Sequence, residues 1–392
     1  MILSRSNCLN FFLITFLMTI PHILFIYQDY SLSIGIALSC ILLFFSSYKY
    51  FTFDKKEFFL ILTLFTLIFI QSSFIIIDTG NFKPIYSAFL FFSCIILVKS
   101  YANKIALNRL NFEQIIKNSL CVIIFFGWFS FIFKDFFSYP DRFVKFIFPF
   151  SEHSHYALCV GFLTIIYGYF QSQSIKLILF FNLLVQSIYF PNLTLMQFSM
   201  MSFMIFFLMR SIKLFIIFIF LFFIFYFLFF GMFLLNPDNY FLSRINFNNT
   251  DNLSALVYLQ GLDDAWISLT TTYGVGLGFQ MAGSGPEGYF TNMIYRFYNT
   301  VLNREDGSFL AAKIVIEFGV VGLLSILMYV FLIFKKVTKI ILSKGSVSLF
   351  DIALIAFFIE MFFRGIGYFS PQLFLLIILY FYSKIDSKIG VF

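Results

Sequence analysis

The chain has 392 residues, of which 61% are hydrophobic and only 11% charged, and its mean hydropathy is +0.93. This composition excludes a soluble globular protein and indicates a single integral membrane domain. The formal net charge of +7 reflects an excess of Lys and Arg on one side of the membrane, and it gives no support to nucleic-acid binding.

Apolar runs predict twelve membrane-spanning helices, because a helix needs about 20 apolar residues to cross a bilayer. Their approximate ranges are 10–28, 31–48, 58–77, 84–98, 118–134, 152–170, 177–190, 192–209, 214–235, 308–334, 348–363 and 371–383. Pro21 and His22 interrupt the first run and no small-residue cleavage site follows, so it is predicted to be a retained span. The five cysteines have no paired spacing, which predicts neither a disulfide framework nor a thiolate metal site. The predicted fold is an all-α polytopic bundle.

One stretch departs from this pattern. Residues 236–306 are polar, rich in Gly, Asn and Asp, and predicted to be irregular. The bilayer core tolerates no exposed irregular backbone, so this stretch must lie outside the membrane. The predicted organisation is therefore nine spans in 1–235, one large loop in 236–306, and three spans in 307–392.

The distribution of basic residues predicts the orientation. With the N-terminus in the cytoplasm, 17 of the 26 Lys and Arg residues are cytoplasmic and nine are outside. Short loops rich in Lys and Arg stay in the cytoplasm, so both termini are predicted to be cytoplasmic and the long loop periplasmic. Five of the nine outer basic residues are arginines: Arg142, Arg244, Arg296, Arg304 and Arg364. The planar guanidinium suits an anionic ligand such as a phosphate; alternatively, these arginines pair with the acids of the loop.

A first candidate site is the segment FSEHSHYA at 150–157, where an outer loop enters the sixth predicted span. If the helix begins near Ser151, Glu152 and His155 share a face and His153 points elsewhere. A carboxylate beside an imidazole at a membrane boundary suits proton transfer near neutral pH. The alternative is a polar cap that only starts the helix.

Two glycine-containing segments follow. In WISLTTTYGVGLG (266–278), Gly274, Gly276 and Gly278 allow a ligand to approach the backbone, although a tight turn against the membrane surface explains them as well. The segment does not have the dinucleotide-binding spacing. In EFGVVG (317–322), the glycines suit close helix packing.

Three charged residues near the later spans complete the candidates. Glu317 is predicted to face the protein interior, because a carboxylate inside a membrane is costly. Glu360 and Arg364 are four residues apart, a spacing that suits an ion pair between them.

Taken together, these segments resemble the Wzy-type O-antigen polymerases, the oligosaccharide-repeat-unit polymerase family. The resemblance rests on the order of F-x-E-x-S-H-x-A, G-x-G-L-G, D-G-S and E-F-G-x-x-G, with twelve spans and a large late loop, and it covers most of the chain. It implies a glycosyltransferase-C-like fold in the bacterial inner membrane. It also implies an enzyme that polymerises undecaprenyl-diphosphate-linked repeat units at the periplasmic face, in lipopolysaccharide biosynthesis. The related O-antigen ligases carry a His-Asn pair where this chain has Ser308-Phe309, which favours a polymerase over a ligase.

Such a reaction needs positive charge to hold the leaving diphosphate and a base to activate the acceptor hydroxyl. The base is predicted among Glu152, His155 and Asp306. The diphosphate is predicted to be held by Arg142, Arg244, Arg296 and Arg304. No cofactor or metal is expected, since Asp263 and Asp264 alone are too few ligands.

The expected partners are the lipid-linked glycan donor and acceptor, membrane lipids, a chain-length regulator and a flippase. Two alternative functions remain, an O-antigen ligase and a lipid-linked oligosaccharide flippase or other transporter. The chain shows no internal repeat of the kind that many transporters contain.

Overall fold

The computed structural model describes residues 5–28, 31–133, 146–209, 213, 253–299, 302–342 and 346–389. Within these residues the regular secondary structure is helical, and the β structure is limited to an isolated bridge between Ile147 and Phe150. The predicted all-α class is therefore confirmed.

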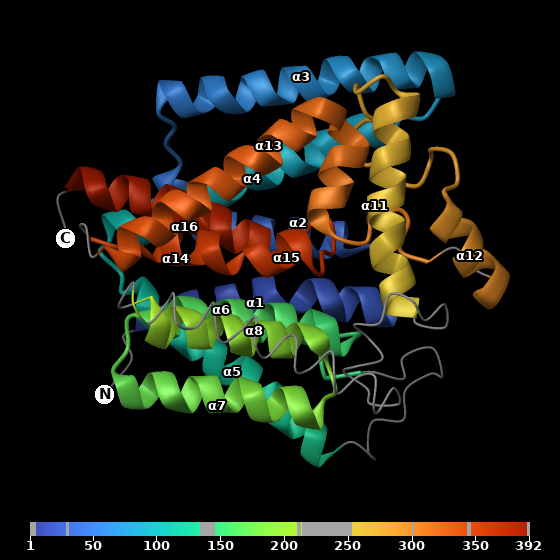
Figure 1. Cartoon of the computed structure of the whole chain (residues 1–392). Helices are drawn as coiled ribbons and strands as arrows, with labels where there is room; N and C mark the ends of the chain where they lie inside the picture. The colour runs from blue at the N-terminus through green and yellow to red at the C-terminus, as the bar shows by residue number, and fades with distance from the viewer. Residues whose placement is uncertain are drawn as a thin grey trace, which may run out of the picture.

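Most of the helices lie side by side and run back and forth along one direction, as Figure 1 shows. In chain order they are α1 (Arg5–Gln28), α2 (Leu32–Phe45), α3 (Lys55–Thr79), α4 (Lys83–Leu107), α5 (Phe112–Ile132), α6 (His153–Tyr169), α7 (Gln173–Tyr189), α8 (Leu193–Phe203), α13 (Leu310–Ile341), α14 (Leu349–Ala356), α15 (Phe358–Phe362) and α16 (Pro371–Ile389). The short elements η1 (Tyr48–Tyr50) and η4 (Met204–Leu208) follow α2 and α8.

Among the described residues, five helical segments are long and apolar enough to cross a membrane. These are Cys8–Ile26, Lys55–Ile77, Lys83–Leu107, Phe112–Ile132 and Leu310–Ile341. The remaining predicted spans coincide with shorter helices or helix pairs, except that 214–235 lies outside the described residues. These helices are compatible with a multi-pass membrane protein, whereas the total of twelve crossings stays a prediction.

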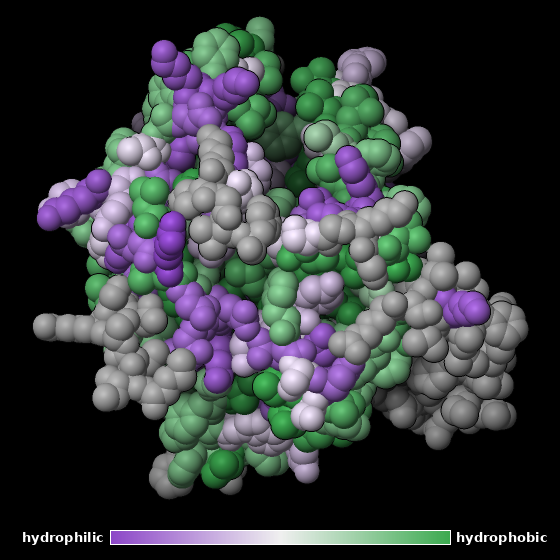
Figure 2. All heavy atoms as spheres, turned by 90° about the vertical axis from the view of Figure 1, so that its left-hand side faces the viewer, coloured by the Kyte–Doolittle hydropathy of each residue, from purple (hydrophilic) through white to green (hydrophobic). Residues whose placement is uncertain are grey.

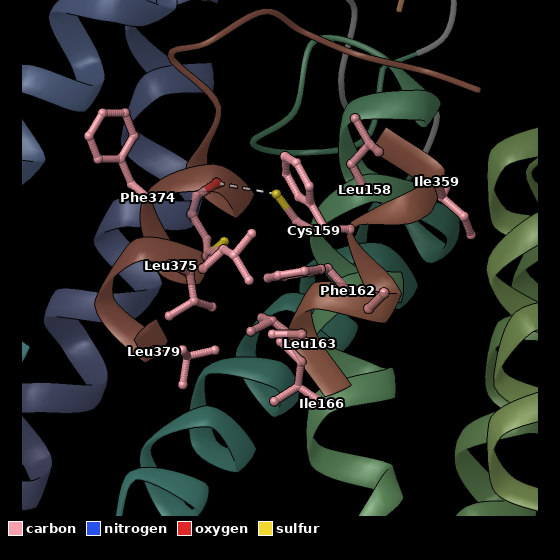
Figure 3. Packing of buried hydrophobic residues seen from close by; sticks show 14 of the residues in the cluster. Leu158, Cys159, Phe162, Leu163, Ile166, Ile359, Phe374, Leu375 and Leu379 are labelled. Carbon is pink, nitrogen blue, oxygen red and sulfur yellow. Dashed lines mark hydrogen bonds between the residues drawn. The ribbon is translucent and has the colours of Figure 1, made fainter. Parts of the chain in front are cut away.

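Apolar side chains interdigitate to fill the interior of the bundle. Figure 3 shows Phe162 and Ile166 of α6 on one side and Phe374 and Leu379 of α16 on the other, all at most 1% exposed. The helix α3 differs, because only 6% of its apolar segment is buried, and Figure 1 shows it at the edge of the bundle. In a membrane, an edge helix exposes its side chains to lipid, which suits the largely apolar surface of α3.

The helix α13 is broken at Gly319, whose backbone (φ 55°, ψ −129°) is not helical. The break removes the intrahelical partners of the carbonyl groups of Ile316 and Glu317. The backbone N–H groups of Leu277 and Gly278 donate to these two carbonyls at 2.8 and 2.9 Å. Unsatisfied backbone groups are costly in apolar surroundings, so the glycine-rich loop seals the broken helix.

Two side chains add to this seal. Ser268 Oγ donates to the carbonyl of Ile316 at 2.7 Å, and Gln71 Nε2 of α3 donates to the carbonyl of Glu317 at 2.9 Å. The seal therefore ties α3, the loop after α11 and α13 together. The edge helix α3 thus has a polar anchor as well as its apolar contacts with α4.

The two glycine-containing segments therefore meet each other. The sequence predicts that Gly319 packs against a neighbouring helix, but the structure places it in the helix break. A Cβ atom on Gly319 would lie 2.0 Å from the carbonyl oxygen of Gly274. The alternating glycines of the loop also serve this contact, because Gly274, Gly276 and Gly278 all have positive φ angles, which glycine adopts without strain.

A Gly276→Ala substitution is expected to destabilise the chain severely. Gly276 has φ +84°, and a Cβ atom there would lie 2.5 Å from the carbonyl oxygen of Glu317. Gly80 is the matched control, because its φ is +69° but its Cβ would meet nothing within 4 Å. We expect Gly276→Ala to cost about 1–3 kcal/mol more than Gly80→Ala, measured by thermal unfolding of the purified protein. Equal losses of stability would show that the loop does not press on α13.

The predicted irregular loop is largely helical where it is described. It contains α11 (Leu253–Thr271) and α12 (Tyr289–Tyr298), so the prediction of irregular structure is wrong for these segments. In Figure 1 both helices lie across one end of the bundle, while α16 ends at the opposite end. We call these the α11 end and the η1 end. The amphipathic α12 explains the error, because its polar residues lower the mean hydropathy of a helical stretch.

Basic residues that were predicted to share the cytoplasmic side come together at the η1 end. Lys99 of α4 and Lys384 of α16 both bond the carboxylate of Glu57, the latter at 2.8 Å. Figure 2 looks at this end and shows hydrophilic residues gathered on it. The grouping agrees with the predicted orientation, although which end faces the cytoplasm stays a prediction.

An accessibility measurement tests that orientation. Tyr273 is 96% exposed at the α11 end, and Asn108 is exposed between α4 and α5. In intact spheroplasts, a membrane-impermeant thiol reagent is expected to label Tyr273→Cys and to leave Asn108→Cys unlabelled, over the background of the native cysteines. The reverse pattern would place the α11 end in the cytoplasm.

Candidate functional site

Two of the three predicted catalytic residues, Glu152 and His155, lie at the start of α6 at the α11 end, and Glu152 forms an ion pair there. Glu152 is the last residue before α6, in an extended conformation, and Arg364 follows α15. Glu152 Oε2 accepts hydrogen bonds from Arg364 Nη2 at 2.9 Å and from Ser154 Oγ at 2.8 Å. His155 lies in the first turn of α6, and its Nδ1 is 2.9 Å from Ser151 Oγ.

The predicted pairing of Arg364 with Glu360 is wrong. Glu360 is 1% exposed, and its neighbouring donor is the hydroxyl of Ser370 rather than Arg364. The helix α15 ends at Phe362, so the spacing of four residues no longer brings Arg364 over Glu360. Arg364 bonds Glu152 instead, and its buried Nε has no partner among the described residues.

The pKa of Glu152 shows what this carboxylate can do. Burial favours the neutral form, but the charges of Arg364 and His155 and the hydrogen bonds from Ser154 and Arg364 outweigh it, lowering the pKa to about 2. Because the pKa is lowered on folding, the interaction stabilises the protein above the ordinary carboxyl pKa and is lost as pH falls toward 2. So weak a base is poorly suited to accept a proton at neutral pH, and Glu152 is better assigned as the anionic partner of Arg364.

His155 lies close enough to three charged side chains to interact with each of them electrostatically. Its ring is 7% exposed, and the charges of Glu152, Arg364 and Asp306 all act on it. The prediction that Glu152 and His155 share a helical face is wrong in detail, because α6 begins at His153. The three predicted catalytic residues nevertheless come together around the start of α6.

Asp306 is the exposed carboxylate of this group. It lies in the turn before α13, where Gly307 and Ser308 have φ values of 66° and 67°. A Cβ atom on Gly367 would lie 3.5 Å from Asp306 Oδ1 and 4.0 Å from Lys313 Nζ, which places the carboxylate beside the loop that carries Arg364. Asp306 has no hydrogen-bond or ion-pair partner among the described residues, so it is available to a substrate.

Lys313 was not among the site residues predicted from the sequence. Its ammonium group is 1% exposed, donates to the backbone carbonyl of Glu305 and lies 3.5 Å from Glu317 Oε1. Glu317 is completely buried and also accepts from the N–H of Ala282 at 3.2 Å, so its predicted inward orientation is confirmed. A lysine inside an apolar span was the available signal, because such residues are costly and usually functional.

The predicted diphosphate-binding arginines differ in their positions and partners. Arg304 is 9% exposed and donates to the carbonyls of Gly285 and Pro286 at 2.7 and 2.5 Å, while its Nε lies 3.4 Å from Asp264. These partners support the alternative interpretation, in which Arg304 holds the loop together, and argue against its predicted role in binding diphosphate. Arg296 is exposed at the end of α12. Arg142 and Arg244 lie outside the described residues.

The adjacent acids of α11 also have structural roles. Asp263 Oδ2 accepts from the N–H of Phe290 in α12 at 3.3 Å. Asp264 faces Arg304 and Thr291, and burial raises its pKa although Arg304 opposes this. These two carboxylates hold α11, α12 and the turn before α13 in one arrangement, and this turn carries Asp306.

The candidate active site therefore consists of Asp306, His155 and the Arg364–Glu152 pair. It combines an accessible carboxylate, an imidazole and a guanidinium, which can together move a proton and hold an anion. The segments that supply them are far apart in the sequence and meet at the α11 end. No protein-family model, curated protein or solved structure matches this chain significantly.

Proposed function

We propose that this chain is an O-antigen polymerase, a glycosyltransferase that polymerises undecaprenyl-diphosphate-linked repeat units at the periplasmic face of a bacterial inner membrane. The observation that carries the proposal is the meeting of Asp306, His155 and Arg364 at the α11 end. A lipid-linked substrate has its diphosphate at the membrane surface, where these three groups would meet it.

The proposed reaction assigns one task to each group. Asp306 accepts the proton of the acceptor hydroxyl, while the oxygen of that hydroxyl forms a bond with the anomeric carbon of the donor glycan. The bond between that carbon and the diphosphate oxygen breaks, and the lipid diphosphate leaves with the electron pair. Arg364 binds the diphosphate, and Glu152 holds the guanidinium in place. His155 bonds a sugar hydroxyl through Nε2, because its Nδ1 already bonds Ser151 Oγ.

A transporter is a second candidate, favoured by the broken helix α13 with Lys313 and Glu317 before the break. Transporters often bind their ions at such interrupted helices. Here, however, the loop at 274–278 occupies the freed backbone groups. An O-antigen ligase would use the same donor and the same site with another acceptor.

Deletion of the gene followed by gel analysis of lipopolysaccharide tests these functions. A polymerase predicts one repeat unit on the core, whereas a ligase or a flippase predicts none. The purified protein should also convert lipid-linked repeat units into a ladder in detergent, where no compartments exist. A ligase and a transporter would both fail to produce that ladder.

A further inference from the structure

The chain has three histidines, and two of them touch although one is in α1 and the other in α6. The ring centroid of His22 lies 5.1 Å from that of His155, with an angle of 37° between the ring planes. His22 also lies 5.0 Å from the ring of Phe150, which precedes α6. The imidazole of His22 therefore packs against both the catalytic-site histidine and the segment that starts its helix.

His22 lies in an environment that suits an apolar residue better. Its side chain is 0% exposed, and its Nδ1 has no hydrogen-bond partner among the described residues. Its Nε2 is 4.0 Å from the sulfur of Cys159, whose thiol donates to the carbonyl of Met18 at 3.6 Å. The amide of Gln372 donates to the same sulfur at 2.9 Å, and Figure 3 draws this bond among apolar side chains. A buried nitrogen without a partner is unfavourable, so a histidine at this position needs a compensating role.

We infer that His22 is a positioning residue, which holds the imidazole of His155 in one orientation by ring contact. Ser151 bonds the Nδ1 atom of His155 at 2.9 Å, and the ring of His22 lies against the same imidazole. The two contacts together define the orientation of the His155 ring. The inference rests on the proposed function, in which His155 presents Nε2 to the substrate, and a small misorientation of such a group lowers catalysis strongly.

The experiment compares three substitutions of the same side chain. His22→Phe keeps a flat ring, His22→Leu fills the space without one, and His22→Ala empties it. His153→Ala is the control, because the His153 ring packs on Phe190 instead. We expect His22→Leu and His22→Ala to lower the rate of polymerisation on the order of tenfold or more, His22→Phe to stay within about threefold of the parent, and the control to change little.

A spectroscopic measurement tests the positioning without relying on activity. With three histidines, the ¹⁵N-labelled rings of the full chain in nanodiscs give three imidazole spin systems, assigned by single substitutions. A His155 ring that keeps its orientation keeps its hydrogen bond to Ser151 at Nδ1, and that bond fixes one tautomer. We therefore expect the parent and His22→Phe to show one tautomer for His155, and His22→Leu to show a mixture. If His22→Leu keeps the parental His155 signals, the inference is wrong. If His155→Ala polymerises normally while the tautomer still depends on His22, the positioning is real and the proposed role of His155 fails.

Discussion

Replacement of Asp306 by asparagine is expected to lower the rate of polymerisation by about 10²–10⁴-fold, the usual contribution of a positioned base. The carboxylate is exposed, has no partner among the described residues and lies beside the loop that carries Arg364. Asparagine keeps the shape of the side chain but cannot accept the proton. The rate would be measured as the growth of the product ladder from lipid-linked repeat units by the purified chain in nanodiscs.

The preceding residue provides a matched control for this substitution. Glu305 is 78% exposed and pairs with Lys83 at 2.9 Å, and that lysine lowers the pKa of Glu305. A Glu305→Gln substitution removes one negative charge from the same turn and breaks a surface ion pair, which contributes little to stability. We expect its rate to stay close to that of the parent. Equal losses for both variants would mean that the charge of the turn matters and that Asp306 is not the base.

Replacement of Arg364 by lysine is expected to lower the rate on the order of 10²-fold, although the positive charge is kept. Arg364 bonds Glu152 through Nη2 and its side chain is still 23% exposed, so the same guanidinium can bond both Glu152 and a diphosphate oxygen. Lysine has no second donor in that plane, and loss of one positioned donor to a developing anion costs about this much. The measurement is the same ladder assay at matched protein concentration.

The exposed Arg296 of α12 provides the control for charge alone, and we expect Arg296→Lys to be nearly neutral.

The pH dependence of the Arg364→Lys variant adds a second test. The pKa of Glu152 is about 2, so Glu152 stays ionised at every assay pH between about 5 and 9. The ratio of the parental rate to the Arg364→Lys rate should therefore be the same at pH 6 and pH 8. A ratio that changes across this range would show that Arg364 acts through a group that titrates there.

Some properties of this protein follow from local sequence alone. Runs of apolar residues predict membrane helices because a bilayer requires length and hydrophobicity within one continuous segment. Apart from α11 and α12, the described helices fall on the predicted apolar ranges. The burial of Glu317 follows from the cost of a carboxylate among apolar residues. The clustering of Glu152 and His155 was visible because the two residues are only three positions apart.

Other properties were decided by contacts between distant segments. The sequence spacing suits a bond between Arg364 and Glu360, but α15 ends before Arg364, which bonds Glu152 instead. Arg304 likewise bonds backbone carbonyls in the loop before α12. The break at Gly319 and the loop that seals it cannot be read from hydropathy, since a glycine in an apolar run is compatible with a continuous helix. Periodicity and composition describe how a segment relates to its solvent, whereas the partner of each polar group depends on which segments the folded chain brings together.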